Sequence, residues 1–368
     1  MTRLSVAFFV SGHGFGHSVR CAEVARVFVE RGARVLLRTD APRWLFGECV
    51  ELIGAPGDWP LDIGVAQHDG LELDIDETRR RWTHFAAEFD VHAEAEARSL
   101  ATYGVDAVLG DIPPLAFETA ARAGVPTFAL GNFGWDWIYA AWPGFEQIVA
   151  RVQSAYARAD ALLRLPLHAS TREAFSAFSR IEDVPLVARR AQRPGTEVRA
   201  ELGISNNARV VLLSFGGFTA RGLDLNALGD WTRYVFVVTP PLAASLRRAP
   251  ANVVAVNETP GDYVSLLAAC DVVVTKPGYG IVADCLANRV AMLFTDRGPF
   301  REYDVMAAAL PTLGPARFLA REDLLRGYVG PHVDALLELD TPWTGEAMNG
   351  AEVVADLIER NVTSVQKR

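Results

Sequence analysis

The sequence predicts an α/β protein with two doubly wound domains, each a parallel sheet covered by helices on both faces. The chain has 368 residues, which suits two domains of about 180 residues. Half of the residues are apolar, enough for two sizeable cores. Short apolar runs recur, and each leads through a turn into a segment of helical period. Unbroken apolar strands that alternate with helices are typical of parallel sheets.

The predicted strands lie in both halves of the chain. In the first half they are LSVAFFV, ARVLLRT, DAVLGD and PTFALGN, and in the second half RVVLLSF, YVFVVT, NVVAVN, DVVVTK and VAMLFT. Residues 183–204 are rich in proline and arginine and interrupt the pattern, so we predict a linker there. The predicted domains span residues 1–188 and 189–345. Residues 346–368 are expected to form a helix that packs back toward the first domain.

Composition narrows the function classes. The formal net charge of −9 and the isoelectric point near 5.4 argue against nucleic acid or an anionic membrane as the main partner. Cys21, Cys49, Cys270 and Cys285 lack C-x-x-C spacing, which disfavours a zinc site and a disulfide framework. No signal peptide or membrane span fits the N-terminal stretch. We therefore expect a soluble, cytoplasmic protein without a metal site; its oligomeric state is left open.

The string SGHGFGH, residues 11–17, follows the first predicted strand. Ser18 is placed to cap the next helix, which would end at Gly32. The loop therefore lies at the carboxyl end of a strand and the N-terminus of a helix, where α/β proteins collect ligands. His17 falls in the first helical turn.

Three interpretations of this loop compete. A dinucleotide site is suggested by Asp40 at the end of the second strand, but His17 stands where G-x-G-x-x-G needs its third glycine. A metal site would need more ligands than His13 and His17. The third interpretation has Gly14 and Gly16 admit a substrate while His17 acts as a base. For His13 a structural role in the turn is favoured.

The second half contains a comparable strand, turn and helix in DVVVTKPGYGIVADCLA, residues 271–287. Backbone N–H groups of the turn can hold a phosphate, Lys276 adds a positive charge, and Asp284 can reach ribose hydroxyls. A second glycine turn, SFGG, follows the first strand of this half. Two such turns suit a diphosphate, and the predicted donor-binding residues are Ser214, Gly216, Gly217, Thr275, Lys276, Pro277, Gly278, Tyr279, Gly280 and Asp284.

Two further patterns, a P-loop and a D-x-D motif, do not indicate a binding site here. The Walker spacing G-x-x-x-x-G-K-[ST] is absent, which argues against ATP binding by a P-loop. Asp74 and Asp76 form a D-x-D string, but it is predicted to lie in an acidic loop away from any strand end. We interpret that string as solvated charge.

With these motifs placed, the chain resembles GT-B glycosyltransferases, and in particular the N-terminal, glycosyltransferase-like half of plant L-arabinokinases. The strings that carry the resemblance run through most of the chain: SGHGFGH, GDIPPLA, GNFGWDWIY, DVPLVARR, SFGG, KPGYG and MNGAEVVADLI. The kinase half of those proteins has a Gly-Leu-Ser-Ser-Ser-Ala loop that is absent here. More distantly, TKPGYGIVADCLA and GPFREYD resemble the donor region of the N-acetylglucosaminyltransferase that makes lipid II.

The resemblance implies two Rossmann-like domains that face a cleft, with the acceptor on the first domain and a nucleotide diphosphate-sugar, most simply a UDP-sugar, on the second. It implies no cofactor and no metal ion. Asp111, at a strand end, would orient His17 or bind the acceptor. Asn132, Trp135 and Asp136 would line the acceptor site, and Glu302 would hold a sugar or ribose hydroxyl.

The function expected from this resemblance is the transfer of a sugar to a hydroxyl or amine of a small molecule or glycan. Two alternatives stay open: hydrolysis or epimerisation of the same donor, and a nucleotide-sugar-binding module without catalysis.

Overall fold

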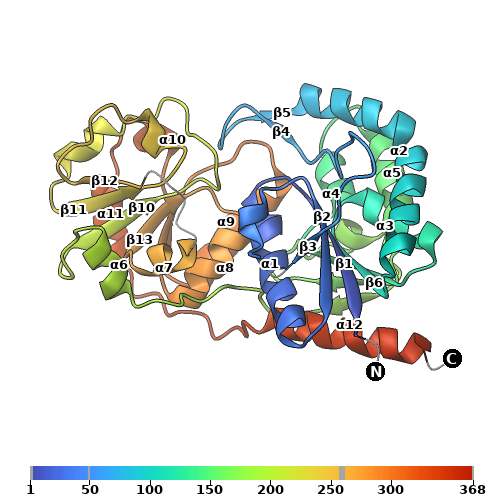
Figure 1. Cartoon of the computed structure of the whole chain (residues 1–368). Coiled ribbons are helices and arrows are strands. Elements are labelled where there is room, and N and C mark those ends of the chain that lie inside the picture. Colours follow the sequence, from blue (N-terminus) through green and yellow to red (C-terminus); the bar gives the residue numbers. More distant parts are fainter. Residues whose placement is uncertain (1–2, 49, 257–261, 367–368) are drawn as a thin grey trace. The chain divides into compact units, whose positions relative to one another are not determined.

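The computed structural model describes residues 3–48, 50–256 and 262–366 (Figure 1). The chain divides into two compact units. Unit 1 comprises residues 1–66, 74–188 and 346–368, and unit 2 comprises residues 67–73 and 189–345. Cys49 lies outside the described residues, and the other three cysteines are buried free thiols.

Unit 1 contains a parallel sheet of seven strands in the order β3-β2-β1-β6-β7-β8-β9. Its strands are β1 (Ser5–Val10), β2 (Arg34–Thr39), β3 (Glu51–Leu52), β6 (Ala107–Asp111), β7 (Thr127–Gly131), β8 (Ala161–Arg164) and β9 (Ile181–Asp183). Every residue of β1, β6 and β7 is buried, as expected for strands with helices on both faces.

The helices of unit 1 form two groups. One group is α1 (Phe15–Glu30) with α12 (Gly350–Gln366), and the other is α2 (Ile75–Tyr103), α3 (Pro114–Ala123) and α5 (Glu146–Tyr156). Figure 1 shows them on either side of the sheet. The shorter helices are α4 (Trp135–Tyr139), η1 (Arg43–Leu45) and η2 (Arg172–Phe175).

The last helix belongs to unit 1. Arg31, just beyond α1, pairs with Asp356 at 2.7 Å and with Glu359 at 3.1 Å on α12. The segment before α12 is held by backbone bonds, among them Gly350 N to the Leu186 carbonyl at 3.0 Å. Residues 346–366 thus complete the first domain.

Unit 2 repeats the topology with six parallel strands in the order β12-β11-β10-β13-β14-β15. The strands are β10 (Arg209–Leu213), β11 (Tyr234–Val238), β12 (Val253–Ala255), β13 (Val272–Thr275), β14 (Ala291–Phe294) and β15 (Ala316–Phe318). The helices are α6 (Gly195–Glu201), α7 (Tyr263–Ala268), α8 (Tyr279–Asn288), α9 (Arg301–Leu313), α10 (Arg321–Leu325) and α11 (Gly330–Leu337), with η3 (Asn226–Asp230) and η4 (Ala243–Ser245).

The predicted fold class is confirmed, and each of the nine predicted stretches contains a strand. Among the strands of the two large sheets, β3, β8, β9 and β15 were not predicted; β3, β9 and β15 are short and largely exposed, so no apolar run marks them. The predicted linker also holds more structure than expected, since α6 forms within residues 183–204.

Residues 67–73 depart from the predicted organisation, because they pack with unit 2 although they lie inside the first predicted domain. Leu71 is buried in the apolar core of unit 2. The Asp69 carboxylate accepts the N–H groups of Leu71, Glu72 and Arg221 at 2.8 to 3.0 Å. The segment is flanked by two paired short strands, β4 (Ala66–Gln67) and β5 (Leu73–Asp74).

The D-x-D string adjoins this segment and has local roles. Asp74 caps α2 by accepting the Glu77 N–H at 2.8 Å, and the exposed Asp76 pairs with Arg79. The string therefore begins a helix rather than lying in a loop, and its charges serve that helix.

Candidate functional site

Unit 1 brings its predicted catalytic residues together at the point where the strand order reverses. β1 lies between β2 and β6, so the chain leaves the neighbouring strands β1 and β6 in opposite directions along the sheet. Such switch points open a crevice at the carboxyl ends of the strands. His17 follows β1 and Asp111 ends β6, which brings two residues 94 positions apart into contact.

The helix that carries His17 begins earlier than predicted. α1 starts at Phe15, with Gly14 as its N-cap residue at φ 69°, a left-handed conformation that favours glycine. Ser18 lies buried inside the helix, so the prediction that it caps the helix is wrong. Gly16 is part of the first turn. His17 therefore lies on a regular helix rather than on a loose loop.

A hydrogen-bonded network joins His17, Asp111 and Arg20. His17 Nδ1 lies 2.7 Å from Asp111 Oδ1. Arg20 donates from Nε to Oδ2 of Asp111 at 2.5 Å and from Nη2 to Oδ1 at 2.6 Å. Arg20 Nη2 also lies 3.1 Å from His17 Nδ1. The sequence analysis did not identify Arg20 as a site residue.

Asp111 is fully buried and ionised. Burial alone would raise the pKa of its carboxyl, but the charge and hydrogen bonds of Arg20, together with the hydrogen bond of His17, outweigh it and lower the pKa to about 2. The Cys21 thiol donates to Oδ2 at 3.2 Å. Ile112, the next residue, has φ 55°, a strained conformation for a β-branched side chain. Strain of this kind is concentrated at functional sites.

Aromatic rings surround His17. The ring centroid of His17 lies 5.8 Å from that of Phe133 and 5.9 Å from that of Trp135. His13 packs edge to face on Trp135 at 5.2 Å and accepts the Val65 N–H on Nδ1 at 3.2 Å. The Trp135 ring therefore lies beside both histidines, and His13 holds the segment around residue 65.

Asp62 is a second carboxyl group that the sequence analysis missed. It is buried, and its Oδ2 accepts the indole N–H of Trp135 at 3.1 Å. Burial raises the pKa of Asp62 to about 6, although hydrogen bonds with Ser11 and Trp135 act in the opposite direction. It lies in the irregular stretch between β3 and β4, where no periodic pattern marks a site.

Two other predicted acceptor residues lie behind the histidine. Asn132 is buried and its side-chain oxygen accepts from Arg20 Nη1 at 2.9 Å. Asp136 is also buried, and its electrostatic partners are Gln153 and Tyr156 of α5, not His17. Burial raises the pKa of Asp136 to about 6. Asp136 thus faces α5 here, and its place in the acceptor site stays a prediction.

Unit 2 has its own switch point, between β10 and β13. Ser214 follows β10, and its hydroxyl accepts from the Tyr263 hydroxyl at 2.7 Å. Gly216 and Gly217 have φ 66° and 82°, so the turn after β10 needs glycine at both positions. Thr275 ends β13. The two predicted phosphate turns thus leave neighbouring strands.

The turn after β13 ends at the N-terminus of α8. Pro277 and Gly278 lead into the helix, and Gly278 is its N-cap residue without a side-chain cap. Tyr279 and Gly280 form the first turn and are buried. The backbone N–H groups of a helix start favour an anion.

Lys276 places a buried amino group beside this helix start. Lys276 is only 9% exposed, and its Nζ lies 4.5 Å from the centroid of the Phe218 ring. No residue of the described ranges forms a hydrogen bond or ion pair with its ammonium group. Burial and the charge of Arg297 lower the pKa of Lys276 well below its usual value, against the opposing charges of Asp69 and Glu302. Lys276 is one of two lysines in the sequence.

Two ion pairs fix the remaining predicted donor residues. Glu302 is buried and accepts from Arg297 Nη1 at 3.1 Å, while the Arg297 guanidinium lies 4.0 Å from the centroid of the Phe300 ring. Asp284 accepts the backbone N–H of Arg189 at 3.0 Å and its guanidinium at 2.5 and 3.2 Å. These three bonds occupy three of the about four acceptor positions of the carboxylate.

Comparison with known proteins identifies the architecture. The chain is similar to the glycosyltransferase SnogD from Streptomyces nogalater, at 17% sequence identity and a TM-score of 0.58, over 97% of this chain and 99% of that one. It is similar to UGT89C1 from Arabidopsis thaliana, at 16% identity and a TM-score of 0.58, over 93% and 92% of the two chains. MurG from Acinetobacter baumannii matches at 15% identity and a TM-score of 0.53, over 97% and 99%.

The fold is GT-B. At the sequence level, the chain is 31% identical to the L-arabinokinase of Arabidopsis thaliana over 369 aligned residues. That match covers 97% of this chain but 34% of the relative, so the chain spans about a third of the length of the curated protein that it matches. No protein-family profile matches the chain. The predicted resemblance to L-arabinokinases and to GT-B enzymes is confirmed.

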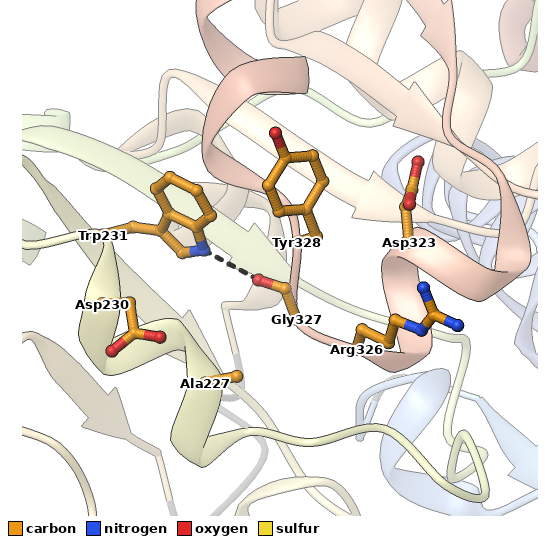
Figure 2. Close-up of a pocket in the computed structure, with 7 residues that line it drawn as sticks. All are labelled: Ala227, Asp230, Trp231, Asp323, Arg326, Gly327 and Tyr328. Atoms are coloured by element: carbon orange, nitrogen blue, oxygen red, sulfur yellow. Dashed lines mark hydrogen bonds between the residues drawn. The ribbon is translucent and has the colours of Figure 1, made fainter.

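None of the predicted donor and acceptor residues lines the pocket beside Trp231 and Tyr328 in unit 2. That pocket has a volume of about 340 Å³ and lies in unit 2, between η3 and the end of α10 (Figure 2). Trp231 and Tyr328 meet there edge to face with centroids 5.4 Å apart, and the Trp231 indole donates to the Gly327 carbonyl at 2.8 Å. The other lining residues are Ala227, Asp230, Asp323 and Arg326.

The described part of the chain contains neither a metal-binding cluster nor a membrane-spanning helix. Its residues contain no group of three or more histidine, cysteine and acidic side chains that could hold a metal ion. None of its helices combines the length and the apolar character needed to cross a membrane.

Proposed function

We propose that the chain is a glycosyltransferase that moves a sugar from a nucleotide diphosphate-sugar to a hydroxyl group, with His17 as the base. The observation that carries this proposal is the 2.7 Å contact between His17 Nδ1 and Asp111 Oδ1 at the switch point of unit 1. A carboxylate on Nδ1 leaves Nε2 for the acceptor, which is the arrangement of a general base with an orienting acid.

The proposed step is a direct displacement. Nε2 of His17 takes the proton of the acceptor hydroxyl while that oxygen bonds to the anomeric carbon of the sugar. The bond from this carbon to the diphosphate oxygen breaks, and the nucleoside diphosphate leaves with the electron pair. The proton then passes from the imidazolium to solvent, so that no oxidant or reductant is needed.

The donor half of the proposal rests on unit 2. The leaving diphosphate carries negative charge, which the buried ammonium of Lys276 and the N–H groups at the start of α8 would stabilise. The glycine turn after β10 would hold the other phosphate. Asp284 would bind a ribose hydroxyl and Glu302 a sugar or ribose hydroxyl. We propose that no metal ion takes part; chelation by EDTA should then leave the rate unchanged.

A UDP-sugar is the proposed donor. The supporting observation is that UGT89C1, which shares the fold, has been crystallised with UDP, with UDP-L-rhamnose and with quercetin. The acceptor would be a small molecule or a glycan that reaches His17 among Phe133 and Trp135, since aromatic rings suit the faces of sugars and flat aglycones. A cytoplasmic location remains a prediction.

The first experiment is a thermal-shift panel with UDP, dTDP, GDP and ADP, followed by product analysis with the sugar forms of the best ligand. UDP should raise the melting temperature most. A sugar–acceptor conjugate formed together with UDP supports transfer. Free sugar would identify a hydrolase instead, an isomerised donor an epimerase, and a bound but unchanged donor a binding module; each of these three results contradicts the proposal.

A further inference from the structure

Arg20 is placed to control the histidine. It lies three residues after His17 on α1, so that both side chains leave the same face of the helix. The residue is 2% exposed, and its guanidinium contacts Asp111 with two nitrogens and Asn132 with the third. A buried guanidinium bound this fully has a fixed position.

The distances determine which nitrogen of His17 carries the hydrogen. Nδ1 has one position in the ring plane, which holds either a hydrogen or a lone pair. Asp111 Oδ1 lies 2.7 Å from Nδ1, and Arg20 Nη2 donates to the same oxygen at 2.6 Å. Arg20 Nη2 lies farther from Nδ1 than Asp111 Oδ1 does, at 3.1 Å. We therefore assign the hydrogen to Nδ1, directed at Asp111, which leaves the lone pair on Nε2.

The charges in the network balance before His17 gains a proton. Asp111 contributes one negative charge and Arg20 one positive charge, at bidentate distance. A histidine beside an unshared carboxylate would be strongly favoured as the cation. Here an imidazolium would share one carboxylate with a guanidinium whose Nη2 lies 3.1 Å away. The guanidinium thus opposes the protonation that the carboxylate favours.

None of the other titratable groups around His17 takes the place of Arg20 in balancing the charge of Asp111. Asp62 acts on His17 electrostatically from the segment between β3 and β4. The His13 ring lies 6.4 Å from the His17 ring, from the loop after β1. Cys21, on α1, is bound to Asp111, and burial raises the pKa of its thiol. Arg20 is the one cationic side chain among the described residues that contacts both His17 and Asp111.

We propose that Arg20 is a positioning residue: by occupying both oxygens of Asp111, it keeps His17 a neutral imidazole with Nε2 available to the acceptor hydroxyl. This inference rests on the proposed function for its catalytic meaning, but the state of the histidine is a property of unit 1. It can be measured without donor or acceptor.

The test is an NMR pH titration of the full-length protein with isotope-labelled histidine. The sequence has seven histidines, and the signal lost in His17→Ala identifies His17. In the wild type, the ring-nitrogen shifts at neutral pH should show the hydrogen on Nδ1. In Arg20→Gln, the titration midpoint of His17 should move up by at least one pH unit, a tenfold change in the protonation equilibrium. Arg20→Lys, which keeps the charge, should restore at least half of that shift.

Two further variants keep the test decisive. Arg26→Gln removes an exposed arginine of the same helix, which pairs with Glu23 and Glu30, and should leave the midpoint unchanged. If Arg20→Gln does not fold, Asp111→Asn reports on the same balance, and its His17 midpoint should fall below that of the wild type. An unmoved or lowered midpoint in folded Arg20→Gln, or an unmoved midpoint in Asp111→Asn, overturns the proposal.

Turnover adds a second readout that a purely structural role would not move. In Arg20→Gln the acidic limb of kcat/KM against pH should follow the NMR midpoint upward. A uniform loss of rate at every pH would make Arg20 a scaffold residue only. If no donor is turned over, the proposed transferase function fails, while the NMR result still decides the role of Arg20.

Discussion

The two switch points of the molecule share a topology but differ in how their charges are matched. In unit 1, the charged groups beside β1 and β6 bind one another: Asp111 is paired with Arg20 and His17. In unit 2, the ammonium of Lys276 beside β13 is buried against the Phe218 ring without a hydrogen bond from the described residues. The first site pairs its charges internally, whereas the Lys276 amino group of the second has no hydrogen-bonded partner among the described residues.

This difference separates two kinds of chemistry. A balanced network with one lone pair directed outward is suited to moving a proton. A buried cation beside a helix start is suited to receiving an anion, because the ligand then supplies the missing charge. Under the proposed function, the same strand-turn-helix unit would therefore supply a base in one domain and an anion site in the other, depending on a few side chains.

The largest effect is expected at the base. His17→Ala should lower kcat about 10² to 10⁴-fold, the range for loss of a general base, and leave nucleotide affinity within about twofold. Product formation and isothermal calorimetry measure the two quantities. His84→Ala, an exposed histidine on α2, is the matched control and should change neither. Equal losses of turnover and nucleotide affinity would make His17 structural.

A second test concerns the buried acid of unit 1. Burial raises the pKa of Asp62 to about 6, above the value of 3.8 for a free side chain. The folded state therefore holds the proton more tightly, and the stability from this group is complete below pH 4 and lost as the pH rises through 6. Asp62→Asn should raise the unfolding free energy at pH 7.5 by about 3 kcal/mol and change it little at pH 4.

Urea unfolding at both pH values measures this difference. Asp58→Asn, which alters an exposed acid of the same segment, should show no such pH dependence relative to the wild type. A stability difference for Asp62→Asn that is constant from pH 4 to 7.5 would contradict the raised pKa.

The charge of unit 2 is tested at Lys276. Lys276→Ala should weaken UDP binding roughly tenfold to a hundredfold, since a hydrogen bond to a charged group contributes about 1.5 to 3 kcal/mol. Calorimetry with UDP gives the affinity. Lys367→Ala changes the other lysine of the chain and should have no effect. Unaltered affinity in Lys276→Ala would remove this residue from the donor site.

The smallest effect is expected at Asp284. Asp284→Asn should weaken UDP binding about twofold to tenfold, the value of one neutral hydrogen bond to the ribose. It should also lower stability, because the substitution removes the charge that binds Arg189. Comparing UDP with inorganic pyrophosphate, which lacks the uridine, separates the ribose contact of Asp284 from its structural role. Only the affinity for UDP should change. Equal losses for both ligands would argue against a ribose contact.

The sequence predicted those parts of the site that stand at strand ends. His17 and Asp111 follow two apolar runs, and parallel strands place such positions at one edge of the sheet. Arg20 was missed, although the signal was available: it is a charged residue on a helix whose neighbours Val19, Cys21 and Val24 are buried. A cation at such a position needs a buried partner.

Other features have no local signal. Asp62 stands in an irregular, glycine- and proline-containing segment, and its role depends on Trp135, which is 73 residues away. Asp136 adjoins Trp135 in the sequence, yet α4 directs it toward α5, because neighbouring residues of a helix leave on different faces. Proximity along the chain to Trp135 therefore does not bring Asp136 into contact with His17.

The segment of residues 67–73 has a practical consequence for dividing the protein. The C-terminal domain is built from two stretches of chain, and the shorter one supplies Leu71 to its core and Asp69 to its loops. A gene fragment that encodes only residues 189–345 would lack both. Chimaeras that exchange the C-terminal domain between relatives should therefore also exchange residues 67–73, so that this domain keeps its complete core.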